Sequence, residues 1–244
     1  IDDKVFVGHN SGTFLVDNHQ TRKISDYSGG YSITPIPEHP DLLLQCTYNF
    51  LVVYSKKHGQ WKARNVIKGF SDLIRFVEFD HRNQLWASHR YQGIYRIRLN
   101  EELDSAEKVT YFGKDTRIWK KGNSLRVFKI EDRIVFTNEE KLFTYDDLNS
   151  AIVPYNFLNE RLGEYVTSFV ISPGPDHHYW FLNDSGIALF RILGTDVEKI
   201  KEFPISLFQD NLIPKEENII PIKSHQAILC LENGYALLNA EASS

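Results

Sequence analysis

Paired carboxylates are the first residues in this sequence that could do chemistry. Glu139-Glu140 and Asp146-Asp147 each place two acidic side chains side by side, and glycoside hydrolases use two carboxyl groups as acid, base or nucleophile. Adjacent residues of a strand, however, point to opposite faces. Both pairs also stand next to predicted turns, where solvated acidic residues are common. We interpret them as turn residues, and the sequence predicts no catalytic residue.

Histidine and cysteine offer the next candidates. His177-His178 could bind a metal, but no nearby Cys or His completes a ligand set, so we expect an exposed turn and no metal site. Cys46 and Cys230 show no C-x-x-C spacing and fall in different repeats. Because a disulfide needs Cα atoms closer than ~7 Å, we expect two free thiols, each buried as a small apolar residue.

Cofactor motifs and targeting signals are absent. The sequence has no GxGxxG, GxxxxGK[ST], HExxH, GxSxG or EF-hand pattern, so we expect no cofactor. The formal net charge of −4 argues against a nucleic-acid partner. No apolar run approaches the ~20 residues of a membrane helix. Because the chain starts at Ile1 and contains no Met, we interpret it as a processed chain or a fragment of a larger protein.

The elements that must position any site are predicted to be β-strands. Aromatic residues make up 13% of the 244 residues, with 16 Phe, 12 Tyr and 4 Trp. Such residues fit a pleated, half-buried surface, and helix-forming windows are scarce here. We expect at most a helical turn around 159–163.

One pattern recurs six times: an apolar strand, a short polar turn and a second apolar strand. Its turns are centred near Gly12, Asn49, Gly93, Lys141, Gly186 and Gly234. The spacing of roughly 38 to 48 residues is that of a four-stranded propeller blade. Asn183-Asp184-Ser185 is formally an N-glycosylation sequon. Because it falls on one of these turns, we interpret it as a turn.

Further β-rich runs flank the hairpins. Runs before the hairpins are 31–36, 74–79, 124–130, 166–171 and 218–222, and runs after them are 60–67, 107–112, 151–157 and 199–203. Each unit is therefore predicted to have strands A to D, with B and C as the hairpin. The first unit lacks strand A and the last lacks strand D. We predict an all-β propeller of about six blades, in one domain spanning 1–244.

The tryptophans divide into two kinds. Trp86 and Trp180 occupy equivalent positions on strand B of two blades, which favours packing between blades over ligand stacking. Trp119 lies outside the repeat, in the long polar loop 114–123.

The third unit resembles a known family. Its residues Asp80-His81-Arg82-Asn83-Gln84-Leu85-Trp86 and Gly93-Ile94-Tyr95-Arg96 are similar to the two-component-regulator propeller repeat, D-x-x-G-x-L-W followed by G-L/I-Y/F-R. Asn83 stands where the family often has Gly, which Asn can replace in a left-handed turn. The other units match mainly in their spacing.

The resemblance implies a periplasmic sensor segment of a hybrid histidine kinase or a related transmembrane regulator. It implies a ligand that is often a carbohydrate, here an oligosaccharide, and contact with the remaining domains of the receptor. A second copy of the chain, in a homodimer, is a further expected partner. Two other functions stay open: a propeller enzyme such as a hydrolase or lyase, and a protein-interaction scaffold.

Ligand contacts are predicted on the face that the B–C and D–A loops share. One B–C turn carries His89, Arg90 and Tyr91, and the longest middle D–A loop carries Arg117, Trp119, Lys120 and Lys121. Aromatic rings stack on sugar faces, while Arg and Lys donate hydrogen bonds to hydroxyl or acidic groups.

Overall fold

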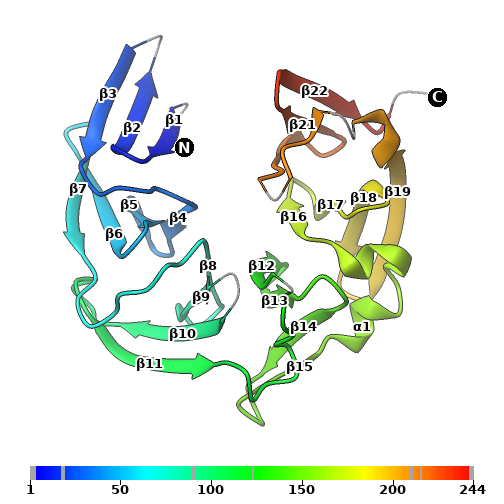
Figure 1. The fold of residues 1–244 in the computed structure, drawn as a ribbon, viewed down its shortest axis with the longest axis horizontal. Coiled ribbons are helices and arrows are strands. Elements are labelled where there is room, and N and C mark those ends of the chain that lie inside the picture. Colours follow the sequence, from blue (N-terminus) through cyan, green and yellow to red (C-terminus); the bar gives the residue numbers. More distant parts are fainter. Residues whose placement is uncertain are drawn as a thin grey trace. The chain divides into compact units, whose positions relative to one another are not determined.

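Six small antiparallel β-sheets follow one another along the chain (Figure 1). The computed structural model describes residues 4–17, 20–89, 92–122, 124–208, 211–214 and 216–241. Within this part of the chain, helix is limited to α1 (Asn156–Asn159) and the 3-10 helices η1 (Gly163–Thr167) and η2 (Ile205–Leu207). The predicted fold, an all-β propeller of six blades, is confirmed.

Each sheet consists of strands that are consecutive in sequence. The first sheet has β1 (Val5–His9), β2 (Gly12–Asp17) and β3 (Gln20–Ser25). The second has β4 (Ile33–Ile36), β5 (His39–Cys46), β6 (Leu51–Lys57) and β7 (Gln60–Val66). The third has β8 (Phe76–Phe79), β9 (Leu85–His89), β10 (Gly93–Leu99) and β11 (Ala106–Phe112).

The last three sheets repeat this order. The fourth has β12 (Arg126–Ile130), β13 (Arg133–Thr137), β14 (Leu142–Asp146) and β15 (Ala151–Pro154). The fifth has β16 (Val170–Pro173), β17 (His178–Leu182), β18 (Gly186–Leu193) and β19 (Asp196–Pro204). The sixth has β20 (Ile219–Lys223), β21 (Gln226–Leu231) and β22 (Gly234–Asn239). Among the described residues, the first sheet lacks strand A and the last lacks strand D, as predicted.

The chain divides into two compact units, which we describe separately. The first comprises residues 1–119 and 125–127, and therefore the first three sheets. The second comprises residues 120–124 and 128–244, and therefore the last three sheets apart from the start of β12.

In the fourth and fifth blades, two strands begin or end at residues other than those predicted. The predicted run 151–157 ends as a strand at Pro154, and α1 follows at once, slightly earlier than the expected turn at 159–163. The start of the run 166–171 belongs to η1. Leu158, Leu162 and Tyr165 are buried, and their spacing of four and three residues suits a helical turn better than a strand.

Hydrogen bonds between neighbouring sheets reproduce the repeat spacing. In the first unit, Arg64 donates to the Glu102 carbonyl (2.8 Å) and Asn65 donates to the Leu103 carbonyl (2.9 Å), each 38 residues away. In the second unit, the Glu131 backbone N–H donates to the Tyr179 hydroxyl (2.8 Å), 48 residues away. Equivalent positions of consecutive blades are therefore neighbours in space.

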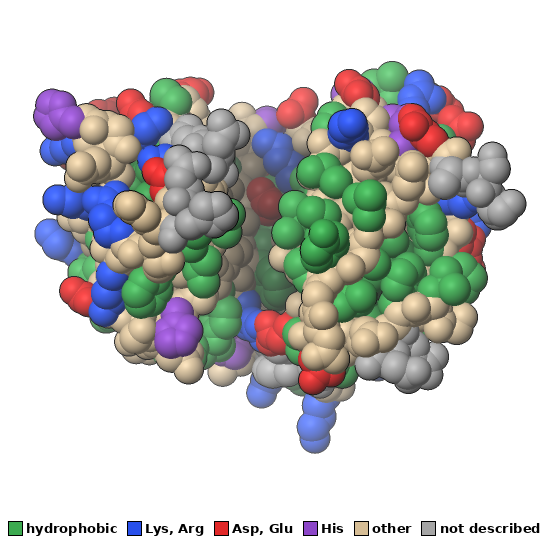
Figure 2. All heavy atoms as spheres, turned by 90° about the horizontal axis from the view of Figure 1, so that it is seen from above, with side chains coloured by type: hydrophobic (Ala, Val, Ile, Leu, Met, Phe, Trp, Pro, Cys, Tyr) green, Lys and Arg blue, Asp and Glu red, His purple; other side chains and the backbone are tan. Residues whose placement is uncertain are grey.

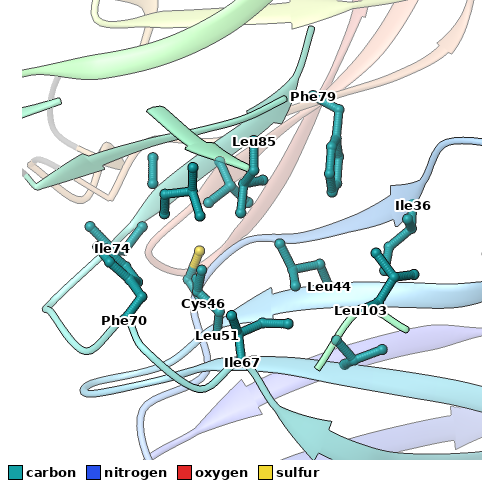
Figure 3. Close-up of a cluster of buried hydrophobic side chains, with 14 residues drawn as sticks. Ile36, Leu44, Cys46, Leu51, Ile67, Phe70, Ile74, Phe79, Leu85 and Leu103 are labelled. Atoms are coloured by element: carbon teal, nitrogen blue, oxygen red, sulfur yellow. The ribbon is translucent and has the colours of Figure 1, made fainter. Parts of the chain in front are cut away.

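The hydrophobic core of each unit lies between sheet faces. Figure 3 shows the cluster between the second and third sheets, where Cys46 packs with Leu51, Phe70 and Leu85. Trp86 and Trp180 are both fully buried, and Trp86 stacks on Phe112. Both tryptophans are buried as predicted, and Trp180 belongs to the cluster between the fifth and sixth sheets.

Asp80 explains the sequence pattern of the third unit. Its carboxylate accepts hydrogen bonds from the backbone N–H groups of Arg82 (2.8 Å) and Gln84 (2.9 Å), and from the Trp86 indole Nε1 (2.8 Å). Asn83 has a φ of 56°, the left-handed conformation that Asn tolerates. One buried carboxylate thus joins the A–B turn to the tryptophan of strand B.

The cysteine and histidine expectations are corrected in part. Both thiols are free, but only Cys46 is buried, while Cys230 is half-buried. His178 is not an exposed turn residue. It begins β17, is buried, and its ring lies 4.6 Å from the His225 ring of the next sheet. The neighbouring blade covers it, which the sequence around His178 could not show.

Candidate functional site

The predicted B–C turn residues fall at the end of β9. His89 is the last residue of β9 and is buried, so it is not an exposed turn residue. Arg90 and Tyr91 lie outside the residues that the structure describes.

His89 occupies a position that caps the B–C turn in other blades. In the second blade, the Thr47 hydroxyl contacts the Phe50 backbone at 2.9 Å. In the fourth, the Asn138 side-chain oxygen accepts from the Glu140 and Lys141 N–H groups. In the fifth, Asn183 does the same for Ser185 and Gly186. The place of His89 opposite Gly93 therefore favours a role in shaping the turn.

The residues of the long D–A loop belong to two units. In the first unit, Arg117 is exposed, and Trp119 is half-buried with the Lys114 ammonium 5.6 Å from its ring. In the second unit, Lys120 pairs with Glu140 and Lys121 is exposed. The structure thus gives one predicted lysine an acidic partner and holds Trp119 against a neighbouring cation.

A contact cluster that the sequence did not reveal lies on the same face of the first unit. The Tyr48 hydroxyl donates to the Asn10 side-chain oxygen (2.5 Å). The Tyr48 ring meets the Tyr31 ring edge to face, with centroids 5.7 Å apart. The Arg75 guanidinium lies over the Tyr31 ring at 4.8 Å. Two B–C turns and two D–A loops, from three blades, supply these four residues.

The repeat geometry positions this cluster. The Tyr31 backbone N–H donates to the Cys46 carbonyl (2.8 Å), and the Arg75 N–H donates to the Ser88 carbonyl (3.3 Å). Both residues therefore precede strand A at the same height, beside the end of strand B. Gly29, at φ 75°, lets the Tyr48 ring lie against the backbone, because a Cβ there would come within 2.3 Å of the ring.

The same arrangement recurs one blade later. The buried Arg126 places its guanidinium 5.2 Å from the Phe76 ring. Each arginine therefore lies over the aromatic residue at the corresponding place in the preceding blade. Tyr31 and Arg75 precede strand A, whereas Phe76 and Arg126 are its first residues. The signal that could have found them is this shared repeat position, which is visible only after the blades are aligned on strand A.

The cluster offers binding groups of two kinds. Aromatic rings supply flat apolar faces for a sugar ring, and the guanidinium and amide supply hydrogen-bonding groups. Stacking on Tyr31 restrains the Arg75 side chain, which reduces the entropy lost when it binds a ligand. No described residue of the cluster has the pairing of nucleophile and base that covalent catalysis needs.

A second polar group lies close by in the third blade. The Tyr95 hydroxyl donates to the Asp72 carboxylate at 2.5 Å, and the Tyr95 ring packs on Phe70 and Tyr111. Burial, together with the Asp72 carboxylate, raises the pKa of Tyr95. The phenol therefore stays protonated and serves as a fixed hydrogen-bond donor at neutral pH.

The described residues contain neither a metal-binding cluster nor a membrane-spanning helix. Across the described residues, no three His, Cys, Asp or Glu side chains are grouped closely enough to hold a metal ion. None of the helices in this part of the chain is long and apolar enough to cross a membrane.

Comparisons with known proteins concern the fold. The sequence matches no protein-family model and no curated protein. Among solved structures, the extracellular domain of the hybrid two-component system BT4673 from Bacteroides thetaiotaomicron is similar, with a TM-score of 0.62 and 14% identity. The match covers 99% of this chain and 31% of that one. The corresponding domain of BT3049 gives a TM-score of 0.61 at 12% identity, with 98% and 32% covered.

Propeller enzymes are similar to the same degree. Virginiamycin B lyase from Staphylococcus aureus has a TM-score of 0.60 at 15% identity, and the match covers 97% of this chain and 76% of that one. The chain thus shares the propeller fold with two-component sensor domains and with enzymes. It spans about a third of the sensor chains that it matches.

Proposed function

We propose that this propeller is the ligand-sensing segment of a transmembrane signal-transduction regulator, and that its ligand is a carbohydrate on the extracytoplasmic, periplasmic side. The observation that carries the proposal is the cluster of Asn10, Tyr48, Tyr31 and Arg75 on one loop face. The fold likeness to extracellular domains of two hybrid two-component systems supports the class of protein. The domain itself is then a binding module, and catalysis lies elsewhere in the receptor.

A thermal-shift screen of oligosaccharides on the purified chain tests this proposal. A ligand that binds only the folded chain, at 100 times its Kd, adds about 2.7 kcal/mol of stability. We therefore expect at least one saccharide to raise Tm by several degrees. If no saccharide in a broad panel does so, the carbohydrate proposal is wrong.

Arginine variants locate the binding site. Arg75→Gln removes the guanidinium that lies on Tyr31, so we expect saccharide affinity to fall at least tenfold, about 1.4 kcal/mol. Arg133→Gln is the matched control, because Arg133 also lies over a tyrosine ring, that of Tyr155 at 5.6 Å, in the second unit. Equal affinity in both variants would place the site elsewhere.

The loop residues predicted from the sequence are proposed as further ligand contacts, each within its own unit. They are Arg90, Tyr91, Arg117, Trp119, Lys120 and Lys121, while the buried His89 contributes by shaping the B–C turn. Trp119→Ala combined with Arg90→Ala should abolish ligand-induced signalling in the full receptor and leave the Tm of the chain nearly unchanged. Normal signalling by the double variant would remove these residues from the site.

An enzyme is the second candidate function, because lyase and lactonase propellers are similar in fold. The saccharides that bind should be incubated with the chain and examined by mass spectrometry. Under the sensor proposal they are recovered unchanged. Turnover that depends on Arg75 would make this propeller an enzyme.

A further inference from the structure

Lysine and arginine gather on the outer strands of the first two blades. Residues 42–71 contain five Lys or Arg and no Asp or Glu, although the whole chain has a net charge of −4. β3 adds Arg22 and Lys23 and also carries no acidic residue. Figure 2 shows Lys and Arg side chains over the left-hand part of the molecule. The first unit therefore has a strongly basic outer side.

A hydrogen bond joins the two blades within this basic surface. The Arg22 guanidinium donates to the Gln60 side-chain oxygen (3.3 Å). Gln60 pairs with Lys57 across the β6–β7 turn, and Lys62 follows two residues later on β7. Arg22, Lys57, Lys62 and Arg64 are all exposed. We call these four residues the basic patch.

The charges of the basic patch are not neutralised by neighbouring carboxylates. Among the described residues, no ion pair involves any of its four side chains. Other outer strands, β11 and β19, carry charges of both signs, whereas β3 and β7 carry only Lys and Arg. Mixed charges are enough to keep an edge strand soluble. The uniform sign therefore indicates a negatively charged partner.

The composition of this surface distinguishes between kinds of partner. No large apolar side chain of β3, β6 or β7 is exposed, and Tyr54 and Trp61 are fully buried. Protein interfaces are enriched in aromatic residues and depleted in Lys, and a saccharide site needs an accessible ring that stacks on the sugar. Lys and Arg without such groups fit a diffuse negative surface, such as a layer of phospholipid headgroups.

We propose that the basic patch contacts the negatively charged phospholipid surface of the membrane beside the receptor. The choice of a membrane rests on the proposed role of the chain as a segment of a transmembrane regulator. Lys57 and Gln60 flank the C–D turn, at the opposite end of the strands from the B–C turn that carries Tyr48. The contact therefore leaves the proposed carbohydrate site open to solvent.

Sedimentation of the purified chain with lipid vesicles tests the contact. Vesicles with equal parts of phosphatidylglycerol and phosphatidylcholine should bind the chain, and vesicles of phosphatidylcholine alone should not. Binding should weaken at least tenfold when NaCl is raised from about 0.05 to about 0.5 M, because salt screens exposed charges. Absence of binding to the anionic vesicles, or equal binding to both kinds, would overturn the proposal.

Charge variants locate the contact on the chain. Lys57→Glu combined with Lys62→Glu should weaken binding to the anionic vesicles at least tenfold, and the two Gln substitutions should weaken it less. Lys108→Glu combined with Lys223→Glu is the matched control, because it changes the net charge equally at two other exposed lysines. It should keep most of the affinity. All these side chains are exposed, so Tm should stay unchanged. An equal loss in the control would contradict a contact through the basic patch.

Two further results separate this proposal from others. Binding of dextran sulfate or polygalacturonate through Lys57 and Lys62, without binding to vesicles, would assign the patch to an acidic polysaccharide and overturn the membrane contact. The saccharide thermal-shift screen contains no vesicles. Failure of vesicle binding therefore leaves the carbohydrate proposal standing, and failure of the screen leaves the vesicle result standing.

Discussion

At the scale of single residues, Asp80 shows how one side chain holds a blade together. Three donors converge on its carboxylate, from Arg82, Gln84 and Trp86. The equivalent tryptophan of the fifth blade, Trp180, has no hydrogen-bond partner for Nε1 among the described residues. The third blade therefore has a polar anchor that the fifth blade's tryptophan lacks.

We expect Asp80→Ala to lower the free energy of unfolding by about 3 kcal/mol, because it leaves buried donors without an acceptor. Asp80→Asn keeps one carbonyl acceptor and should cost less. Urea unfolding measures both values. In the matched comparison, Trp86→Phe should cost more than Trp180→Phe, since only Trp86 loses a hydrogen bond to Asp80. Equal costs for the two tryptophan variants would contradict the anchoring role of Asp80.

At the scale of strands and turns, the glycine that begins strand C in several blades has a steric cause. A Cβ at Gly12, Gly93 or Gly186 would come within 2.1, 2.4 or 2.6 Å of a strand D carbonyl oxygen. In the last sheet, which lacks strand D, a Cβ at Gly234 would meet no atom within 4 Å. The glycine that marks strand C thus lets strand D approach.

Gly186→Asn should therefore lower the free energy of unfolding by at least about 2 kcal/mol, because the new side chain overlaps the Phe203 carbonyl. Gly59→Asn is the control. Gly59 has a φ of 72° with nothing within 4 Å of a Cβ, and Asn tolerates that conformation. Thermal unfolding compares the two. A loss as large in Gly59→Asn would refute the steric explanation.

At the scale of the whole molecule, titration of buried thiol and phenol groups at high pH, and of two carboxyl groups at low pH, should lower the free energy of unfolding. Burial raises the pKa of Cys46 to about 12 and also raises the pKa values of Tyr54, Tyr155 and Tyr179. Hydrogen bonds from Asn100 and Asn149 lower the pKa values of Asp104 and Asp146. The folded chain therefore keeps phenol and thiol protons that the unfolded chain releases, and releases carboxyl protons that the unfolded chain keeps.

We expect the free energy of unfolding to fall as pH rises above about 9, where the unfolded thiol and phenols lose protons first. It should also fall as pH drops below about 4, through the lowered pKa values of the two carboxyl groups. Cys46→Ala removes one group and should reduce the alkaline slope by about 1.4 kcal/mol per pH unit. Urea titrations at pH 7 to 11 measure this slope, and an unchanged slope would show that Cys46 does not contribute.

Most of the fold follows from local sequence. Strand pairing within each blade could be predicted because alternation, polar turns and landmark glycines all act over fewer than twenty residues. The predicted strand runs 151–157 and 166–171 were too long at the ends that face the expected helical turn, because α1 and η1 occupy those ends. The apolar side chains of Leu158, Leu162 and Tyr165 are buried there. The polar strand β3 was expected as strand D of the first unit, but its residues were not located because they carry little apolar pattern.

The sequence by itself determined the six repeats and their strand order, because these depend on residues within one repeat. It also indicated the burial of Trp86 and Trp180, because the two tryptophans recur at one repeat position. Only the tertiary structure decided which side chains from different repeats meet. Tyr31 and Arg75 are 44 residues apart in sequence and touch because equivalent positions of consecutive blades are neighbours. His178 is buried against His225 for the same reason. Burial and contact in a propeller depend on the next sheet, which the sequence of one repeat does not contain.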